Sequence, residues 1–471
     1  MTESAMENPT IHKTSALLAT VFMAQFLVAL DVSLVNIALP DVQSELGFTG
    51  AGLQWVVSAY LLTFAGFMLL GGRLGDLWGR RRVLVAGLVL FMAASVFGGF
   101  AWAPEALIAA RAVQGLAGAL IAPAALALVT TLPDGPLRSR GMGLWGAAGA
   151  GGGAVGVVLS GLLTDGFGWR AVLFVNIPIV LIGLVVTLRG VPAGRAASTR
   201  PRLDVLGAAL VTVGVAALVY GVTAAGDDGW GSVGAIIGFV VAAILIASFV
   251  AVESRTEHPL MPLALFRARS IVGANVFGFM LSAGQLAAFY FASLYIQNVW
   301  GVSSNVAGFM FLPFCVFVVV GIVLATKLAR AIGPRNTLAI LGLVGAAGLA
   351  GFSMMPDDTA FWTWVLIPSI LGGVGIGGSM VVLGAAATAG VPQTDAGVAS
   401  GVLNSSRQLG GTIGLAILVT IAAHVTSNSD AASAAGAAGD GYGVGLAIGA
   451  VFLVVGSILA YLIIPRRVDN L

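Results

Sequence analysis

Long apolar segments follow one another along almost the whole chain, separated by short connections rich in turn residues. A helix rises about 1.5 Å per residue, so about 20 mostly apolar residues are needed to cross about 30 Å of hydrocarbon. The first segment is too long for a signal-peptide core and lacks a convincing cleavage site, so we expect it to be retained. The pattern predicts an all-α membrane protein with 14 spans at residues 15–39, 51–71, 83–101, 105–130, 141–163, 169–189, 204–224, 231–252, 270–298, 304–326, 336–355, 360–389, 397–424 and 442–464.

Charged residues are too scarce to cover a water-exposed surface. They make up 9% of the 471 residues, against about 25% in a soluble domain. The bilayer is therefore expected to be the solvent for most of the chain. A single cysteine, Cys315, excludes an intrachain disulfide and a thiolate cluster, and three scattered histidines do not indicate a metal site.

The basic residues fall on alternate sides of the expected spans, which sets the orientation. Arg170 is expected outside, and Arg111 and Arg407 lie within spans. With the N-terminus in the cytoplasm, the other 19 of the 22 lie inside: Lys13, Arg73, Arg80, Arg81, Arg82, Arg138, Arg140, Arg189, Arg195, Arg200, Arg202, Arg255, Arg267, Arg269, Lys327, Arg330, Arg335, Arg466 and Arg467. This pattern follows membrane topology and does not indicate nucleic-acid binding. We therefore expect a multi-pass protein of the cytoplasmic (inner) membrane with both termini cytoplasmic.

Two longer cytoplasmic connections divide the spans into groups of six, two and six. The loop at 72–81 has a degraded counterpart at 326–335, each following the second span of its half. Such repeats build two related bundles around a central cavity in many transporters. The expected parts are a cytoplasmic N-terminus (1–14), an N-terminal six-helix bundle (15–189), a linker (190–203), two inserted helices (204–252), an interfacial linker (253–269), a C-terminal six-helix bundle (270–464) and a tail (465–471).

Five segments resemble the major facilitator superfamily, specifically its fourteen-span drug:proton antiporter family. The resemblance covers nearly the whole chain, and the five segments occur in the expected order, at residues 30–40, 72–84, 111–118, 169–178 and 396–411. The resemblance implies the major facilitator fold, transport driven by a proton gradient and no cofactor. The residues that match the fourth-span motif are Arg111, Gln114, Gly115 and Gly118.

The fifth span departs from the family pattern. The family's antiporter motif usually has Gly-Pro with paired glycines further on, whereas here Val157 follows Gly156. The bend that Pro would cause is therefore not expected. The Gly-rich run at 146–156 offers a similar adaptability, and the motif's candidate residues are Gly152, Gly156 and Gly161.

Asp31 is the only acidic residue placed well inside a span. A charge at mid-membrane costs at least about 2.5–3.5 kcal/mol, so an intramembrane acid is a functional candidate by default. Asp31 and Arg111 lie at expected depths of about 12 and 9 Å from the outer side, so they can meet across the cavity if spans 1 and 4 are neighbours. Burial disfavours the charged carboxylate and a nearby Arg favours it, so motion would change its proton occupancy. The alternative is a static ion pair.

The loop between spans 2 and 3 is expected to act as a conformational latch. Asp76 would be stabilised by the helix dipole at the N-terminal end of span 13. Gly72 and Gly79 would permit close packing, and Arg80 and Arg81 complete the motif. The alternative is that these charges only follow the positive-inside rule.

The central cavity is expected to be aromatic and weakly polar. For Arg407, hydrogen bonding to carbonyls or Asn404 and contact with substrate remain open alternatives. Interhelical hydrogen bonding and ordinary packing are the alternative for the other candidates, which are Phe22, Phe26, Gln54, Tyr60, Gln285, Phe289, Tyr290, Tyr295 and Asn404.

These features favour proton-coupled efflux of small amphipathic, neutral or cationic compounds such as drugs, antibiotics and toxic metabolites, carried out by a monomer. Proton-coupled uptake or facilitated diffusion of a metabolite by the same fold is the first alternative, and a membrane-embedded enzyme is a remote one. The glycine pattern at 373–378 lies inside an apolar span and predicts helix packing instead of dinucleotide binding. Neither Lys13 nor Lys327 follows the glycines of a phosphate-binding loop, so we expect no ATP-driven step.

Overall fold

The computed structural model describes residues 8–466 except 131, 133–135, 193–203, 257, 258, 260–262, 357–359 and 390–395. The side chains at 8–13, 50, 51, 69, 76, 130, 136, 139, 150, 226, 227, 263, 264, 396 and 397 are also outside the description. Within the described residues, the secondary structure is entirely helical. This confirms the all-α prediction.

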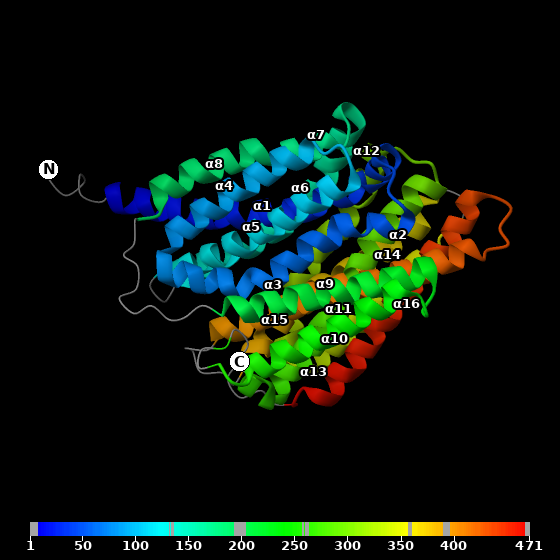
Figure 1. The fold of residues 1–471 in the computed structure, drawn as a ribbon. Helices are drawn as coiled ribbons and strands as arrows, with labels where there is room; N and C mark the ends of the chain where they lie inside the picture. The colour runs from blue at the N-terminus through cyan, green and yellow to red at the C-terminus, as the bar shows by residue number, and fades with distance from the viewer. Residues whose placement is uncertain are drawn as a thin grey trace.

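The first half of the chain forms one bundle (Figure 1). Helix α1 packs against α5, α6 and α8, while α4 packs against α5 and α8, and α3 packs against α5. The helices are α1 (Asn8–Leu46), α2 (Gly50–Leu53), α3 (Trp55–Trp78), α4 (Arg80–Gly99), α5 (Pro104–Thr130), α6 (Pro136–Phe167), α7 (Arg170–Phe174) and α8 (Asn176–Gly190).

The last part of the chain forms a second bundle, in which α11 packs against α14, α15 and α16, and α13 packs against α14 and α16. Its elements are a short 3-10 helix (Leu263–Arg267), α11 (Arg269–Leu294) and its π-helical extension (Tyr295–Val299), α12 (Ser304–Met310), α13 (Leu312–Ser353), a π-helical turn (Trp362–Leu366), α14 (Ile367–Thr388), α15 (Ala396–Ser427) and α16 (Ala434–Ile463).

The two inserted helices, α9 (Val205–Asp228) and α10 (Val233–Glu253), lie beside the junction of the bundles. Helix α9 packs against α3 of the first bundle and α15 of the second, and α10 packs mainly against α9. Gln54 in the first bundle donates to Thr223 Oγ1 of α9 (2.9 Å), and Thr420 of α15 donates to the Val222 carbonyl (3.3 Å). Helix α9 therefore joins both halves.

Twelve helical stretches among the described residues are long and apolar enough to cross a membrane, and the difference from the expected fourteen arises at two places. One stretch, Ser304–Ser353, contains 50 residues and is interrupted at Gly333, where φ is 81° and ψ is 161°. The other place is α3, a helix of 24 residues. Its apolar stretch with every residue described is Trp55–Met68, which is shorter than a membrane span. The first stretch is long enough for two spans and α3 is long enough for one, which favours fourteen spans. The number of spans stays a prediction.

The two expected counterpart loops share a backbone feature. Gly79 between α3 and α4 has φ 92° and ψ 131°, close to the values at Gly333 within α13. A side chain strongly disfavours a positive φ, so glycine suits both positions. Two residues after each glycine an arginine reaches the last helix of its own bundle: Arg81 donates to the Leu188 carbonyl (2.9 Å), and Arg335 lies over the Tyr461 ring (4.0 Å). These similarities support the internal duplication.

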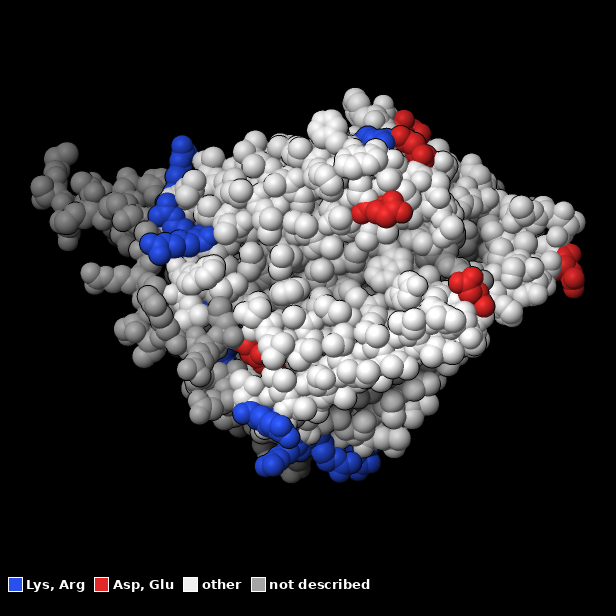
Figure 2. All heavy atoms as spheres, viewed as in Figure 1, with Lys and Arg blue, Asp and Glu red and all other residues white. Residues whose placement is uncertain are grey.

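Charged residues gather at opposite ends of the molecule. Figure 2 shows most of the visible Lys and Arg at the end where the N-terminus lies, and most of the visible Asp and Glu at the other. At the acidic end Arg170 pairs with Glu45. A basic end favours the cytoplasmic side, so this distribution favours the expected orientation. Glu253, which was placed in the second linker, is instead the last residue of α10 and is buried.

Candidate functional site

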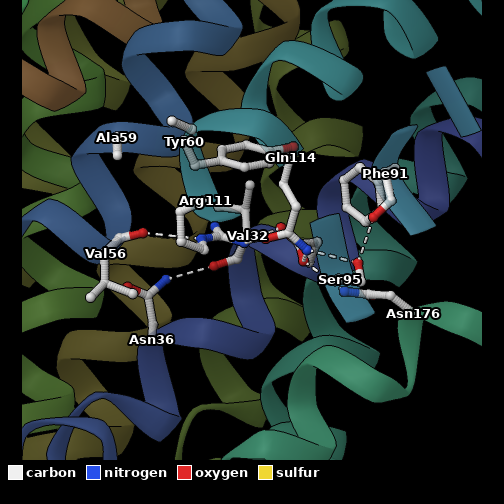
Figure 3. A network of polar contacts seen from close by, with 12 residues as sticks. Val32, Asn36, Val56, Ala59, Tyr60, Phe91, Ser95, Arg111, Gln114 and Asn176 are labelled. Atoms are coloured by element: carbon white, nitrogen blue, oxygen red, sulfur yellow. Dashed lines mark hydrogen bonds and ion pairs between the residues drawn. The ribbon is translucent and has the colours of Figure 1, made fainter. Parts of the chain in front are cut away.

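The carboxylate of Asp31 is buried in the first bundle. Figure 3 shows the polar network to which it belongs, with Arg111, Gln114 and Asn176 labelled. Arg111 Nη1 lies 2.6 Å from Asp31 Oδ2, so the expected contact between the first and fourth spans is present. Asp31 is 0% exposed and Arg111 is 2% exposed. The pair was expected to meet across the cavity; in this structure α1 packs directly against α5 and encloses both side chains within one bundle. Their role in proton coupling stays a prediction.

The guanidinium of Arg111 also ties α5 to α3. Its Nε donates to the Val56 carbonyl (3.0 Å), its Nη1 donates to Gln114 Oε1 (2.8 Å), and its Cζ lies 4.5 Å from the centre of the Tyr60 ring. The helices approach closely because Gly115 has no side chain: a Cβ there would overlap the Tyr60 carbonyl oxygen. A change in the protonation of Asp31 would therefore alter contacts that Arg111 makes between α5 and α3.

Two polar residues that the sequence analysis did not select complete this network. Asn176, the first residue of α8, donates from Nδ2 to Asp31 Oδ1 (2.8 Å). Ser95 of α4 accepts a hydrogen bond from Gln114 Nε2 (2.8 Å) and donates to the Phe91 carbonyl (2.8 Å). Both are 0% exposed. Their only signal in the sequence was a polar side chain within an apolar segment, although Asn176 also lies in the stretch at 169–178.

The fifth-span glycines let α6 lie directly on α1. A Cβ at Gly152 would be 2.7 Å from the Phe26 carbonyl oxygen, and one at Gly156 would be 2.8 Å from the Leu30 carbonyl oxygen. One turn further on, Ser160 donates to the Leu34 carbonyl. Helix α6 therefore supports the stretch of α1 on either side of Asp31, although Val157 stands where the family usually has Pro.

The two bundles are joined along the second half of α1, at the end that is expected to face the outside. Ser293 Oγ of α11 donates to the Asn36 carbonyl (3.2 Å), Gln297 Nε2 donates to the Ile37 carbonyl (3.1 Å), and Ser304 Oγ donates to Asp41 Oδ2 (3.1 Å). Gly161 of α6 faces the backbone of α12 closely enough that a Cβ would overlap it. We call these contacts the outer seam. In this state the halves meet at the end opposite the basic one.

The central residue of the expected latch, Asp76, lies outside the described side chains, as does the start of α15. The packing at Gly72 leaves room for a side chain, because a Cβ there would be 3.7 Å from Pro123 Cβ, an ordinary van der Waals distance. Arg80 Nη1 donates to the Ala127 carbonyl near the end of α5 (2.6 Å), and Arg81 reaches α8 as described above. Cations at helix C-termini are favourable, so both arginines stabilise the first bundle. The latch itself stays a prediction.

Four of the expected cavity residues make hydrogen bonds to protein. Gln54 donates to α9, Tyr295 donates to the Met355 carbonyl (2.6 Å), and Asn404 donates to the Ser400 carbonyl on its own helix (3.2 Å). Arg407 donates from Nη2 to Met380 Sδ (3.5 Å), and none of the described hydrogen bonds joins it to Asn404. Its Nε is buried and has no hydrogen-bond partner among the described residues, which leaves substrate contact open.

The other expected cavity residues are divided between the two bundles, on α1 and α3 of the first and on α11 of the second. Phe22 and Phe26 stack on each other on α1, with ring centres 5.7 Å apart, and both are half-buried. Phe289 packs between two other aromatic rings, and Gln285 is half-buried. Tyr60 belongs to the Asp31 network, and Tyr290 instead lines a pocket near the outer seam. The structure therefore does not gather the whole set in one place.

Comparison with known proteins identifies relatives along nearly the full chain. The sequence profile of the Major Facilitator Superfamily matches residues 21–415. The chain is 38% identical over 442 residues to the cephamycin export protein CmcT of Amycolatopsis lactamdurans, covering 93% of this chain and 90% of that protein. It is 37% identical over 462 residues to the puromycin resistance protein pur8 of Streptomyces alboniger, covering 96% and 92%.

A solved structure supports the fold independently of these sequences. The bacterial homologue of the human lysosomal transporter Spinster, solved in an inward-facing and unoccupied conformation, matches with a TM-score of 0.66 over 97% of both chains. The two sequences are 14% identical, so this likeness concerns the arrangement of helices alone.

Proposed function

Because this chain belongs to the major facilitator superfamily, we propose that it exports small amphipathic compounds, neutral or cationic and including antibiotics, across the cell membrane in exchange for protons. The named relatives at 38% and 37% identity are an antibiotic export protein and an antibiotic resistance protein. The structural observation that carries the proton-coupled part is the fully buried carboxylate of Asp31, held by Arg111 and Asn176.

Helix α1 contains Asp31 and also forms one side of the outer seam. Protonation of Asp31 can therefore affect whether the site is open to the outside. Asn36 lies five residues after Asp31 on α1, and its carbonyl accepts from the second bundle. Protonating Asp31 removes its charge and weakens its bond to Arg111, because charge-assisted hydrogen bonds are roughly twice as strong as neutral ones. Arg111 then holds α1 less tightly against α3 and α5. The outer part of α1 becomes freer to leave the seam.

The energy of this pair is large enough to bias a conformational equilibrium. Removing one partner of a buried ion pair costs about 3–5 kcal/mol in soluble proteins. Moving a two-state equilibrium from 1:99 to 99:1 takes about 5.5 kcal/mol. A protonation event at Asp31 can therefore supply a substantial part of that difference, with substrate binding supplying the rest.

The remaining features of the proposal concern the cell and the energy source. A proton gradient drives the cycle, and no cofactor, metal or ATP takes part. The protein works as a monomer in the cytoplasmic membrane, with both termini on the basic, cytoplasmic side. The latch formed by Asp76 would control opening on that side. The half-buried aromatic residues Phe22 and Phe26 would provide apolar contact area for substrate.

Transport of a fluorescent cationic dye in inverted vesicles tests the proposal. An imposed pH gradient, acidic inside, should drive accumulation by the native chain, and Asp31→Asn should abolish that dependence. The control is Asp165→Asn, which changes an exposed acid at the outer end of α6 and should leave accumulation unchanged. Equal gradient-driven accumulation by Asp31→Asn would remove Asp31 from proton coupling. Gradient-driven movement in the opposite direction would favour uptake.

A further inference from the structure

The side-chain amide of Asn176 is buried beside Asp31 with one end in use and the other end free. Its Nδ2 donates to Asp31 Oδ1 (2.8 Å), whereas its Oδ1 has no hydrogen-bond partner among the described residues. The residue is 0% exposed, so bulk water does not compensate for the free oxygen. A buried polar atom without a partner is rare and calls for an explanation.

An amide differs from other neutral partners because it can serve both forms of a carboxyl group. Asn carries two N–H donors and a carbonyl acceptor, while Asp accepts only when ionised and gains an O–H donor when protonated. The ionised carboxylate is matched by Nδ2, as observed. The protonated carboxyl would be matched by Oδ1 if the amide turned about χ2 by half a revolution, a torsion that is broad and roughly two-fold.

The free end makes that rotation inexpensive. If Oδ1 accepted a hydrogen bond from a neighbouring helix, turning the amide would break that bond and oppose protonation. Because the end facing away from Asp31 has no described partner, either orientation leaves the same number of hydrogen bonds to protein. We propose that Asn176 is a positioning residue for proton coupling, whose amide donates to ionised Asp31 and rotates to accept from the protonated acid.

The other groups around Asp31 cannot take this part. Arg111 from α5 has no acceptor, and Tyr60 from α3 contacts the Arg111 guanidinium through its ring, with no described hydrogen bond to Asp31. Gln114 also contacts Asp31, since its Nε2 lies 3.5 Å from Asp31 Oδ1. Its Oε1 already accepts from Arg111, and its Nε2 also donates to Ser95. From α6, Gly152 and Gly156 lie against the α1 backbone at Phe26 and Leu30. Among the described residues that hydrogen-bond to Asp31, Asn176 alone has an acceptor oxygen without a hydrogen-bond partner.

The proton balance is simple. One proton is added at Asp31 Oδ1, and the N–H···O⁻ bond from Asn176 is replaced by an O–H···O bond to Asn176 Oδ1. The bond from Arg111 to Asp31 Oδ2 weakens because its acceptor is no longer charged. Asn176 is also the first residue of α8, which follows the one-residue break at Val175. This inference rests on the proposed role of Asp31 in transport, and its test below reads protonation directly.

Infrared spectroscopy of the full chain in lipid provides the test. The carbonyl band of protonated Asp31, identified by its loss in Asp31→Asn, is titrated against pH. Asn176→Leu should raise the titration midpoint by about one pH unit, because the ionised form loses the stronger, charge-assisted bond. The same variant should shift the band to higher frequency, because the acid loses its acceptor. Asn176→Met, with a more adaptable side chain, gives the same readouts if Leu does not fold.

Asn275 of α11 offers a matched control. It is also a buried amide with an unpartnered Oδ1, but its Nδ2 donates to the Ile271 carbonyl of its own helix. Asn275→Leu should move neither the midpoint nor the band. A raised midpoint with an unshifted band in the Asn176 variants would mean that the amide only donates, which overturns the proposal, as would no change at all. Normal transport by Asp31→Asn alongside both shifts would refute proton coupling but not the amide's two roles.

Discussion

The outer seam can be perturbed by a single methyl group at Gly161. The Cβ of Gly161→Ala would lie 2.8 Å from Asn305 Cα and would overlap the Ser304 carbonyl oxygen, both in the backbone of α12. Ordinary van der Waals contact begins at 3.4 Å, so α6 and α12 must separate by about 0.6 Å to clear Asn305 Cα and by more than that to clear the Ser304 carbonyl oxygen. Neither side can adjust by changing a rotamer, because the atoms in the way belong to backbone.

The expected cost follows from overpacking in well-packed interiors, which is typically about 1–3 kcal/mol. This strain exists only while the seam is closed, so it acts as a bias of the same size against the closed state. Such a bias corresponds to about a 5–150-fold change in the ratio of the two states. The variant should therefore spend far more time open to the outside, and its transport should fall because the cycle requires outer closure.

Cysteine modification from the outside measures this change. The buried Cys315 is first replaced by Ala, and Leu294→Cys provides a reporter near the seam, where the native side chain is 3% exposed. A membrane-impermeant maleimide should modify the reporter at least about 5-fold faster in Gly161→Ala. The control is Gly166→Ala on the same helix, since nothing lies within 4 Å of a Cβ there. An unchanged modification rate in a folded Gly161→Ala protein would refute the reasoning.

Three further substitutions test other parts of the structure. Arg111→Met should lower the free energy of unfolding in detergent by about 3–5 kcal/mol, because the buried charge of Asp31 loses its cation. Adding Asp31→Asn should recover much of this loss, and no recovery would contradict a stabilising role for the ion pair. Gly66→Ala should lower Tm because its Cβ would overlap the Thr212 side chain of α9, and Thr212→Gly should relieve it; an additive loss would contradict this contact. Asp76→Asn should slow dye transport while leaving dye affinity largely intact, and unchanged turnover would count against the latch.

Hydropathy and charge allowed the membrane architecture to be predicted from the sequence. The free energy of placing a segment in hydrocarbon depends mainly on its own residues, so a long apolar run predicts a span without knowledge of its neighbours. Asp31 was found for the same reason, since an acid in such a run is costly wherever the helix packs. Its contact with Arg111 needed one further premise, the adjacency of the first and fourth spans, which came from the family resemblance.

Partners within the site depended on helix packing and could not be read from the chain. Asn176 is 145 residues from Asp31 along the sequence, and nothing local distinguishes it from a polar residue that bonds its own helix, as Asn275 does. The enclosure of the Asp31–Arg111 pair also depends on helix packing. The position of a residue along its helix does not show whether a neighbouring helix covers its side chain. The division of the expected cavity residues between separate regions was likewise a consequence of rotation about each helix axis.

The sequence by itself therefore determined that the chain is embedded in a bilayer, where its apolar segments lie, and that Asp31 is a costly acid within one of them. Tertiary structure alone decided that the acid is sealed inside one bundle, that an asparagine from α8 supports it, and that Gly161 closes the outer seam despite the missing fifth-span proline. The physical reason is that transfer into hydrocarbon is a sum over single residues, whereas hydrogen bonds and close contacts are properties of pairs. Such pairs exist only after the helices have packed.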